Sequence, residues 1–302
     1  MFGQAYRGKA VYVDLQRIGD ARYELGESPV WDHRNGVLYF VDAAACAVLC
    51  CDPESGKTRR WDVDGGYLGA MALCEDSGVV VVMDNGFHRL DLETGATVAL
   101  AEPEAVNEET GFNDCKVDRQ GRLVGGSLHT GASEPRGSIY RLDADHTCTR
   151  IDTGLIESNG PCFSPDGRTF YIADSYAEVI YAYDYDPVSG DASNRQVFYS
   201  SAGKGGQPDG ATVDAEGHVW SAQFGAGKIH RIAPDGNVVR SIDVPVKWVS
   251  CMTFAGPDND TMYVTSIGCE IAGERDDSPE AGGLFVIRGL GVQGLPEPRF
   301  AG

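Results

Sequence analysis

The stretch "NGPCFSPDGRTFYIADS", residues 159–175, contains two short apolar runs joined by a tight turn. In Ser164-Pro165-Asp166-Gly167 the proline presets φ and the glycine can adopt a positive φ, a combination typical of turns between antiparallel strands. The run Thr169–Asp174 is rich in β-branched and aromatic residues, which favours a strand. One polar side chain, that of Asn159, stands at the start of the first strand, where it would face a crowded interior.

This two-strand unit recurs six times along the chain. The second strands begin at Leu38, Val79, Leu123, Phe170, Val219 and Met262, so the repeats are 41 to 49 residues apart. Each unit continues with a third strand, a hairpin and a polar fourth strand, as in "GFHRLDLETGATVAL" (86–100). No stretch of a dozen residues shows helical periodicity. Repeats of four strands at this spacing are typical of a β-propeller.

We therefore predict an all-β fold: a six-bladed β-propeller with four antiparallel strands per blade, built as one domain over residues 1–302. The sixth unit lacks a full outer strand. The N-terminal segment "KAVYVDLQRI", residues 9–18, can supply that strand and close the ring by pairing the two ends of the chain.

Aligning the six units predicts a cluster of polar side chains at one mouth of the central channel. The central apolar residues of the first strands are Trp31, Leu73, Val117, Phe163, Val213 and Phe254, and the positions four residues earlier are Glu27, Gly69, Asn113, Asn159, Asp209 and Ser250. Four of these six carry carboxylate or carboxamide oxygens, hard ligands that suit a divalent cation. A turn is the commoner role for any one Asn-Gly or Asp-Gly pair. Four equivalent positions around one axis favour a metal site, because buried carboxylates and amides are costly unless paired or metal-bound.

Composition narrows the functional class. The 302 residues are 42% hydrophobic and contain no apolar run near 18 residues, so we expect no transmembrane helix. Residues 1–16 lack a basic region followed by an apolar core, and we expect no secretory signal. The net charge of −20 argues against nucleic acid. Nine cysteines at irregular spacing, with no CxxC pair, favour free thiols in a reducing cytosol over disulfides or a cysteine zinc site. We expect a cytoplasmic protein whose partner is a small molecule.

Several motifs, in order, resemble the regucalcin/gluconolactonase family: "LGESPVWD" (25–32), "GFNDCKVD" (111–118), "SNGPCFSPDG" (158–167), "PDGATVDAEGHVW" (208–220) and "VSCMTFAGPDNDTMYVTS" (249–266). The resemblance implies a six-bladed propeller with one divalent metal in the central channel and hydrolysis of sugar lactones to aldonic acids. It also implies that Glu27, Asn159 and Asp209 bind the metal and that Asn113 holds substrate or a nearby water. The oxygen ligands leave the metal open among Ca²⁺, Zn²⁺, Mn²⁺, Fe²⁺ and Mg²⁺.

The chemistry of lactones assigns further roles. A metal can act as a Lewis acid on the lactone carbonyl oxygen while a base takes a proton from the attacking water. Asp209 is the expected base, and Asp114 is a weaker candidate because its neighbouring position points it away from the axis. His129 follows the second strand of the third unit and is a candidate substrate contact. The family often has arginine where this chain has Gly111, which removes a multi-donor clamp for substrate hydroxyls.

Two other functional classes stay open at this stage. One is a hydrolase or isomerase that acts on a non-sugar lactone, which the missing arginine allows. The other is a metal-binding propeller without catalysis, because a fold does not determine a function. The sequence makes no prediction of oligomeric state.

Overall fold

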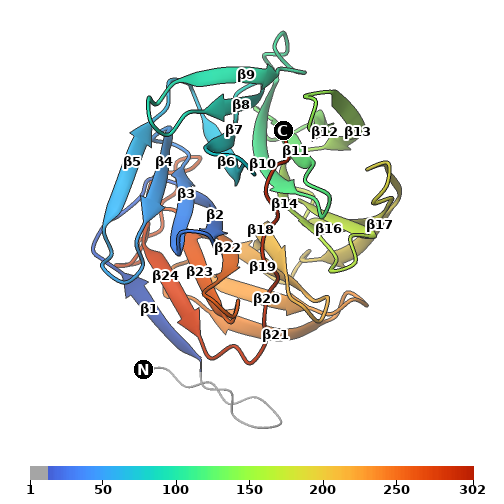
Figure 1. Ribbon diagram of the computed structural model, residues 1–302. Helices are drawn as coiled ribbons and strands as arrows, with labels where there is room; N and C mark the ends of the chain where they lie inside the picture. The colour runs from blue at the N-terminus through green and yellow to red at the C-terminus, as the bar shows by residue number, and fades with distance from the viewer. Residues whose placement is uncertain (1–12) are drawn as a thin grey trace.

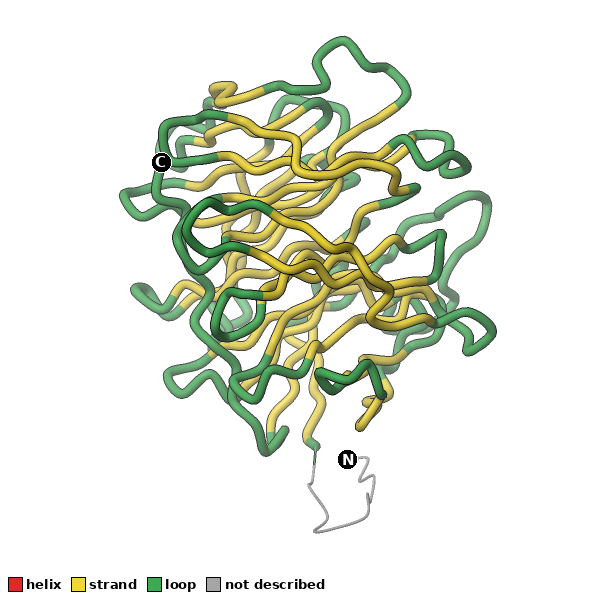
Figure 2. Tube along the Cα trace, turned by 90° about the vertical axis from the view of Figure 1, so that its right-hand side faces the viewer, coloured by secondary structure: helices red, strands yellow, loops and turns green. Residues whose placement is uncertain are grey.

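The computed structural model describes residues 13–302, and all regular secondary structure in this range is β-strand. Six four-stranded sheets are arranged as a ring around a central axis (Figure 1). Seen from the side, strands fill the body of the ring and loops gather at the ends of the strands (Figure 2). The predicted six-bladed β-propeller is confirmed.

The first three blades each use four consecutive strands. Blade one contains β2 (Gly26–Asp32), β3 (Val37–Asp42), β4 (Ala47–Cys51) and β5 (Thr58–Asp62). Blade two contains β6 (Leu68–Leu73), β7 (Val79–Met83), β8 (Gly86–Leu90) and β9 (Thr97–Ala101). Blade three contains β10 (Thr110–Val117), β11 (Leu123–His129), β12 (Gly137–Leu142) and β13 (Cys148–Leu155).

The last blade joins the two ends of the chain. Blade four contains β14 (Ser158–Phe163), β15 (Thr169–Asp174), β16 (Val179–Tyr185) and β17 (Ala192–Ser200). Blade five contains β18 (Gln207–Val213), β19 (Val219–Phe224), β20 (Lys228–Ile232) and β21 (Val238–Asp243). Blade six contains β22 (Val249–Ala255), β23 (Thr261–Ser266), β24 (Leu284–Arg288) and, as its outer strand, β1 (Asp14–Ile18). Closure by the N-terminal segment is therefore confirmed for residues 14–18; residues 9–12 of the predicted strand lie outside the described range.

The strand register agrees with the alignment of the repeats. Each central apolar residue pairs with the residue predicted to begin the second strand: Trp31 with Leu38, Leu73 with Val79, Val117 with Leu123, Phe163 with Phe170, Val213 with Val219 and Phe254 with Met262. The six positions chosen from the sequence are thus equivalent in the fold.

The hydrophobic core is divided among the faces between neighbouring sheets. Six clusters of buried side chains occur, one for each pair of adjacent blades. Between blades six and one, for example, Trp31 stacks on Tyr263 with ring centroids 5.7 Å apart. Because every sheet is covered on both faces, the inner strands can start at the axis without exposing apolar surface.

A C-terminal strap, residues 289–302, crosses one face of the ring from blade six to blade three (Figure 1). Phe300 is fully buried in the cluster between blades two and three, and its N–H donates to the Leu73 carbonyl. Gly294 lies against Phe254, and Ala301 N–H donates to the Gly121 carbonyl. The strap therefore covers one end of the central channel.

Other expectations can be compared with the structure directly. All nine cysteines are free thiols. No helix in residues 13–302 is long and apolar enough to cross a membrane. The expected lack of a secretory signal concerns residues 1–16, most of which lie outside the described range.

Candidate functional site at the centre of the ring

Every inner strand has a β-bulge close to its predicted polar position. The ladder shifts by one extra residue between Glu27 and Val30 in β2, Leu68 and Ala70 in β6, Phe112 and Asp114 in β10, Asn159 and Cys162 in β14, Pro208 and Ala211 in β18, and Val249 and Met252 in β22. A bulge leaves a residue out of the ladder and turns its side chain to a new direction. The six bulges thus let the first residues of the inner strands leave the pleat together at the mouth of the channel.

Aspartates at or next to the ends of second strands hold the segments that lead into the inner strands. Asp42 accepts hydrogen bonds from the N–H groups of Glu24 and Leu25, Asp84 from Gly66 and Tyr67, and Asp174 from Ile156 and Glu157, at N···O distances of 2.9 to 3.2 Å. The same device therefore fixes Leu25, Tyr67 and Glu157 in blades one, two and four.

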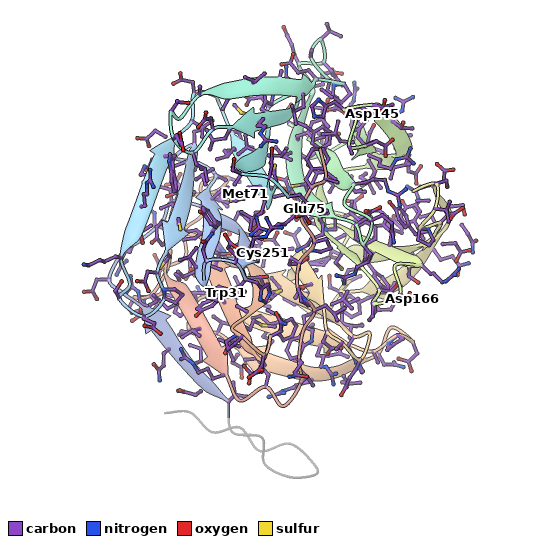
Figure 3. The ribbon with its side chains drawn as sticks, in the orientation of Figure 1. Trp31, Met71, Glu75, Asp145, Asp166 and Cys251 are labelled. Carbon is purple, nitrogen blue, oxygen red and sulfur yellow. The ribbon has the colours of Figure 1, made fainter. Side chains whose placement is uncertain are left out.

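These segments and strand starts surround a cavity of about 610 Å³, counting the part continuous with solvent. Its lining residues are Leu25, Glu27, Tyr67, Gly69, Asn113, Asp114, Glu157, Asn159, Ser175, Tyr176, Gln207, Asp209, Phe224, Ile267 and Ile271. They come from all six blades. Figure 3 shows Met71 and Cys251, from inner strands of blades two and six, near the centre, and Asp145 and Asp166 toward the rim.

A chain of hydrogen bonds orients the two asparagine side chains. Tyr67 Oη donates to Asn113 Oδ1 (3.0 Å), and Asn113 Nδ2 donates to Asn159 Oδ1 (3.0 Å) and to the Ser158 carbonyl (2.9 Å). Asn159 Nδ2 donates to Ser175 Oγ (2.9 Å), whose own proton goes to the Pro208 carbonyl (2.7 Å). Both N–H groups of Asn113 are therefore used within the protein. Asn159 Oδ1 keeps one lone pair for a further partner.

Four carboxyl groups face this one cavity. Burial, together with the charge of Asp114, raises the pKa of Glu27 to about 8. Burial and then the charge of Glu27 raise the pKa of Asp209 well above its usual value. Burial and then the charge of Asp174 raise the pKa of Glu157 to about 7.

The fourth carboxyl group, Asp114, differs in its partners. Burial raises its pKa to about 6, against the opposing effect of Lys116. Its two oxygens accept the backbone N–H groups of Cys115 (2.7 Å) and Gly160 (2.8 Å). Asp209 accepts the Gly210 N–H, and its charged neighbours are the carboxyl groups of Glu27, Glu157 and Asp114. Asp114 thus has a nearby ammonium, whereas the charged groups named beside Asp209 are all acidic.

A buried ion pair lies beyond Asp114 on the strap side of the channel. Lys116 Nζ contacts Glu297 Oε1 at 3.2 Å, with side-chain exposures of 14% and 11%. Thr212 Oγ1 also donates to Glu297 Oε1, at 3.2 Å. Asp114, Lys116 and Glu297 line a second, smaller cavity. The strap therefore supplies the counter-charge for Lys116, a largely buried lysine near the site.

The structure brings Glu27, Asn113, Asn159 and Asp209 together. The expectation that Asp114 points away from the axis is wrong, because Asp114 lines the same cavity. His129 is not among the residues that line the cavity; its Nδ1 accepts the backbone N–H groups of Ser133 and Glu134.

Two of the six equivalent positions chosen from the sequence, Gly69 and Ser250, have packing roles. A Cβ at Gly69 would lie 2.0 Å from the Asn113 carbonyl oxygen, so no side chain fits there. Ser250 Oγ donates to the Gly26 carbonyl at 2.6 Å and joins neighbouring inner strands.

Sequence reasoning missed several lining residues. Tyr67, Glu157 and Gln207 each lie two residues before one of the six equivalent positions. A search restricted to those six positions cannot find them. For Tyr67 and Glu157 the sequence does contain a signal. The second-strand segments "VLYFVD", "VVVVMD" and "TFYIAD" end in an aspartate, and in these blades the aspartate holds the segment that precedes the inner strand.

The oxygen donors fit a divalent cation. Glu27, Asn159 and Asp209 offer two carboxylates and one carboxamide oxygen, hard ligands of the kind that Ca²⁺ and Mg²⁺ prefer. Burial, and after it the repulsion between neighbouring carboxylates, raises the pKa values of Glu27 and Asp209. A nearby positive charge favours the ionised form of both groups and opposes these effects. Within residues 13–302 no group of three His, Cys, Asp or Glu side chains could hold a metal ion. The residues that fit a cation here therefore include the carboxamide of Asn159.

Comparisons with known proteins agree with this architecture. Residues 25–268 match the model of the SMP-30/gluconolactonase/LRE-like region. The chain is 37% identical to a 6-deoxy-6-sulfogluconolactonase of Pseudomonas putida, covering 92% of this chain and 95% of that protein. It is 34% identical to a pentonolactonase of Haloferax volcanii, over 94% and 97% of the two chains. The structure of a calcium-binding protein, regucalcin, from Agrobacterium tumefaciens superposes with a TM-score of 0.86 at 29% identity, over 94% and 96% of the two chains.

Proposed function

This chain belongs to the SMP-30/gluconolactonase/LRE-like family, and we propose that it hydrolyses a sugar lactone to the corresponding aldonic acid with the help of a divalent cation in the central cavity. The observation that carries the proposal is the convergence of Glu27, Asn159 and Asp209 on one cavity. Relatives named as lactonases that cover nearly the whole chain support the same reaction.

Glu27, Asn159 and Asp209 are the residues that would hold the cation. Asn159 Oδ1 is suited to this role because its amide nitrogen is committed to Ser175, which leaves the oxygen directed away from that serine. A cation bound there supplies a Lewis acid for the lactone carbonyl oxygen and stabilises the charge that develops on it.

Asp209 is the proposed general base. It takes a proton from water as the water oxygen bonds to the carbonyl carbon. The bond between that carbon and the ring oxygen then breaks, and the ring oxygen leaves as a hydroxyl after receiving the proton that Asp209 took from the water. The products of this sequence are one hydroxyl and one carboxylic acid on the same molecule. One water is consumed, and the acid releases its proton to solvent as it becomes the carboxylate.

Tyr67 and Asn113 orient the groups around the reacting centre. Because the Tyr67 hydroxyl donates to Asn113 Oδ1, its oxygen keeps lone pairs that can accept a substrate hydroxyl. Asn113 has used both N–H groups, so its remaining capacity is one lone pair on Oδ1. We propose that it accepts a hydrogen bond from a substrate hydroxyl or from the attacking water.

A panel of aldono-1,4- and 1,5-lactones, assayed by acid release with and without chelator, tests the reaction. We expect activity that the chelator removes and that added divalent cation restores. Asp209→Asn keeps an oxygen ligand but loses the base, so kcat should fall on the order of 10²-fold or more while the fold survives. Asp64→Asn, an exposed carboxylate change, is the matched control. Near wild-type turnover by a metal-loaded Asp209→Asn variant would move the base elsewhere, and Asp114 would be tested next.

A further inference from the structure

The apolar residues that line the central cavity gather on one side of its wall. Leu25, Phe224, Ile267 and Ile271, here called the apolar wall, come from blades one, five and six, which are adjacent in the ring. Tyr67, Asn113, Glu157, Asn159 and Tyr176 come from blades two, three and four, on the opposite side. Three further polar residues, Glu27, Gln207 and Asp209, come from the inner strands β2 and β18 of blades one and five. The apolar part of the lining is therefore confined to one side of the cavity, on blades that also carry the two carboxyl groups proposed to hold the cation.

The apolar wall is a built surface. Leu25 and Ile267 are joined by an isolated β-bridge between blades one and six. Phe224 stacks on Trp248 at 5.2 Å between ring centroids, and Asp276 fixes the Trp248 backbone by accepting its N–H at 3.1 Å. Ile271 sits at a tight turn closed by hydrogen bonds with Glu274.

The electrostatics of the same cavity disfavour a negatively charged ligand. Among the described residues, none of those that line the cavity is Lys, Arg or His, whereas four are carboxylic acids. The nearest buried ammonium, Lys116, lies on the strap side of Asp114 and is neutralised by Glu297. One bound divalent cation would be matched by Glu27 and Asp209, so no positive charge is left over for an anionic substituent.

We infer that the physiological substrate is an uncharged lactone with an unhydroxylated carbon end, such as a methyl group, that packs on the apolar wall. This inference rests on the proposed lactone hydrolysis and narrows its substrate class. The hydroxyls of the substrate lie on the side of Tyr67 and Glu157, which offer acceptors. An uncharged substrate distinguishes this chain from the relative named 6-deoxy-6-sulfogluconolactonase, whose substrate carries an anionic sulfo group.

Matched lactones isolate the substituent. The set is glucono-1,5-lactone, its 6-deoxy counterpart and its 6-deoxy-6-sulfo counterpart, together with galactono-1,4-lactone and 6-deoxygalactono-1,4-lactone. In at least one configuration we expect kcat/KM for the methyl compound to exceed that of the hydroxyl compound by about 10- to 100-fold, the range over which an apolar pocket rejects an added hydroxyl. The sulfo compound should be slower than the hydroxyl compound by on the order of 10²-fold, from repulsion by the facing carboxylates.

Two variants test whether the apolar wall causes the preference for the methyl compound over the hydroxyl compound. Ile271→Ser should reduce the methyl-to-hydroxyl ratio several-fold, while Val188→Ser, at a position 89% exposed in the outer hairpin of blade four, should leave the ratio unchanged. A sulfo compound that is hydrolysed as fast as the hydroxyl compound would overturn the inference. So would a methyl-to-hydroxyl ratio of one or less in both configurations, or a ratio unaffected by Ile271→Ser. In each of these cases lactone hydrolysis itself stands; hydrolysis of no lactone in this set or in the wider panel would overturn the proposed function and the inference with it.

Discussion

Replacing Glu297 by glutamine tests whether the ion pair between the strap and Lys116 stabilises the protein. The change leaves the Lys116 ammonium, which is 14% exposed, without its partner at 3.2 Å. Breaking a buried ion pair from one side costs about 3 to 5 kcal/mol, because the remaining charge stays buried and uncompensated. A chain of this size has an unfolding entropy of about 0.6 kcal/mol/K, so the Tm should fall by about 5 to 8 °C.

The stability lost in Glu297→Gln should depend on pH. Although burial acts in the opposite direction, the charges of Lys116 and Arg119 hold the pKa of Glu297 below its usual 4.5. A carboxyl group with a lowered pKa in the folded protein adds stability above pH 4.5 and loses it as the pH falls through the folded-state pKa. The difference in stability between wild type and Glu297→Gln should therefore be full at neutral pH and shrink in acid.

Thermal and urea unfolding of four proteins measure these effects. The set is wild type, Glu297→Gln, the double variant with Lys116→Met, and the control Asp62→Asn, which breaks an exposed pair with Arg60. The double variant should be more stable than Glu297→Gln because the buried ammonium is removed together with its partner, and the control should lose less than about 1 kcal/mol. A cost for Glu297→Gln no larger than that of the control, or a double variant less stable than Glu297→Gln, would refute the reasoning.

Three further outcomes are expected. A divalent cation at about 100 times its Kd should raise the wild-type Tm by about 4 °C, since binding only to the folded state adds about 2.7 kcal/mol of stability. The Tm of Asp209→Ala should shift little, and an equal shift in both proteins would place the ion elsewhere. Gly111→Arg should narrow the range of lactones hydrolysed, five-carbon lactones included, without loss of fold, because the nearest atom to a Cβ there is 3.5 Å away; an unchanged panel of kcat/KM values would contradict the role of the missing arginine. Tyr67→Phe removes the donor to Asn113 Oδ1 and should lower kcat/KM by roughly 10-fold for one lost hydrogen bond, and wild-type kinetics would show that Asn113 needs no such support.

The sequence alone was sufficient for the fold and for the central group of polar residues. Strand pattern and turn residues are local, and six copies of one unit repeat them, so errors in a single blade do not obscure the period. Alignment on residues such as Trp31 and Phe163 gave the register that the structure confirms. Glu27, Asn159 and Asp209 followed because equivalent positions in a closed ring meet at its axis.

What only the tertiary structure decided depends on contacts between different repeats. The bulges turn the first residues of the inner strands toward the axis, and no residue type in one strand specifies that shift. His129 was chosen from its place at the end of a strand, but the loop that follows supplies hydrogen bonds to its ring, and the side chain does not line the cavity. Lys116 and Glu297 are 181 residues apart and meet only because the strap crosses the ring. The apolar wall joins residues of three blades whose shared direction is set by ring closure, which is a property of the assembled sheets and not of any one segment.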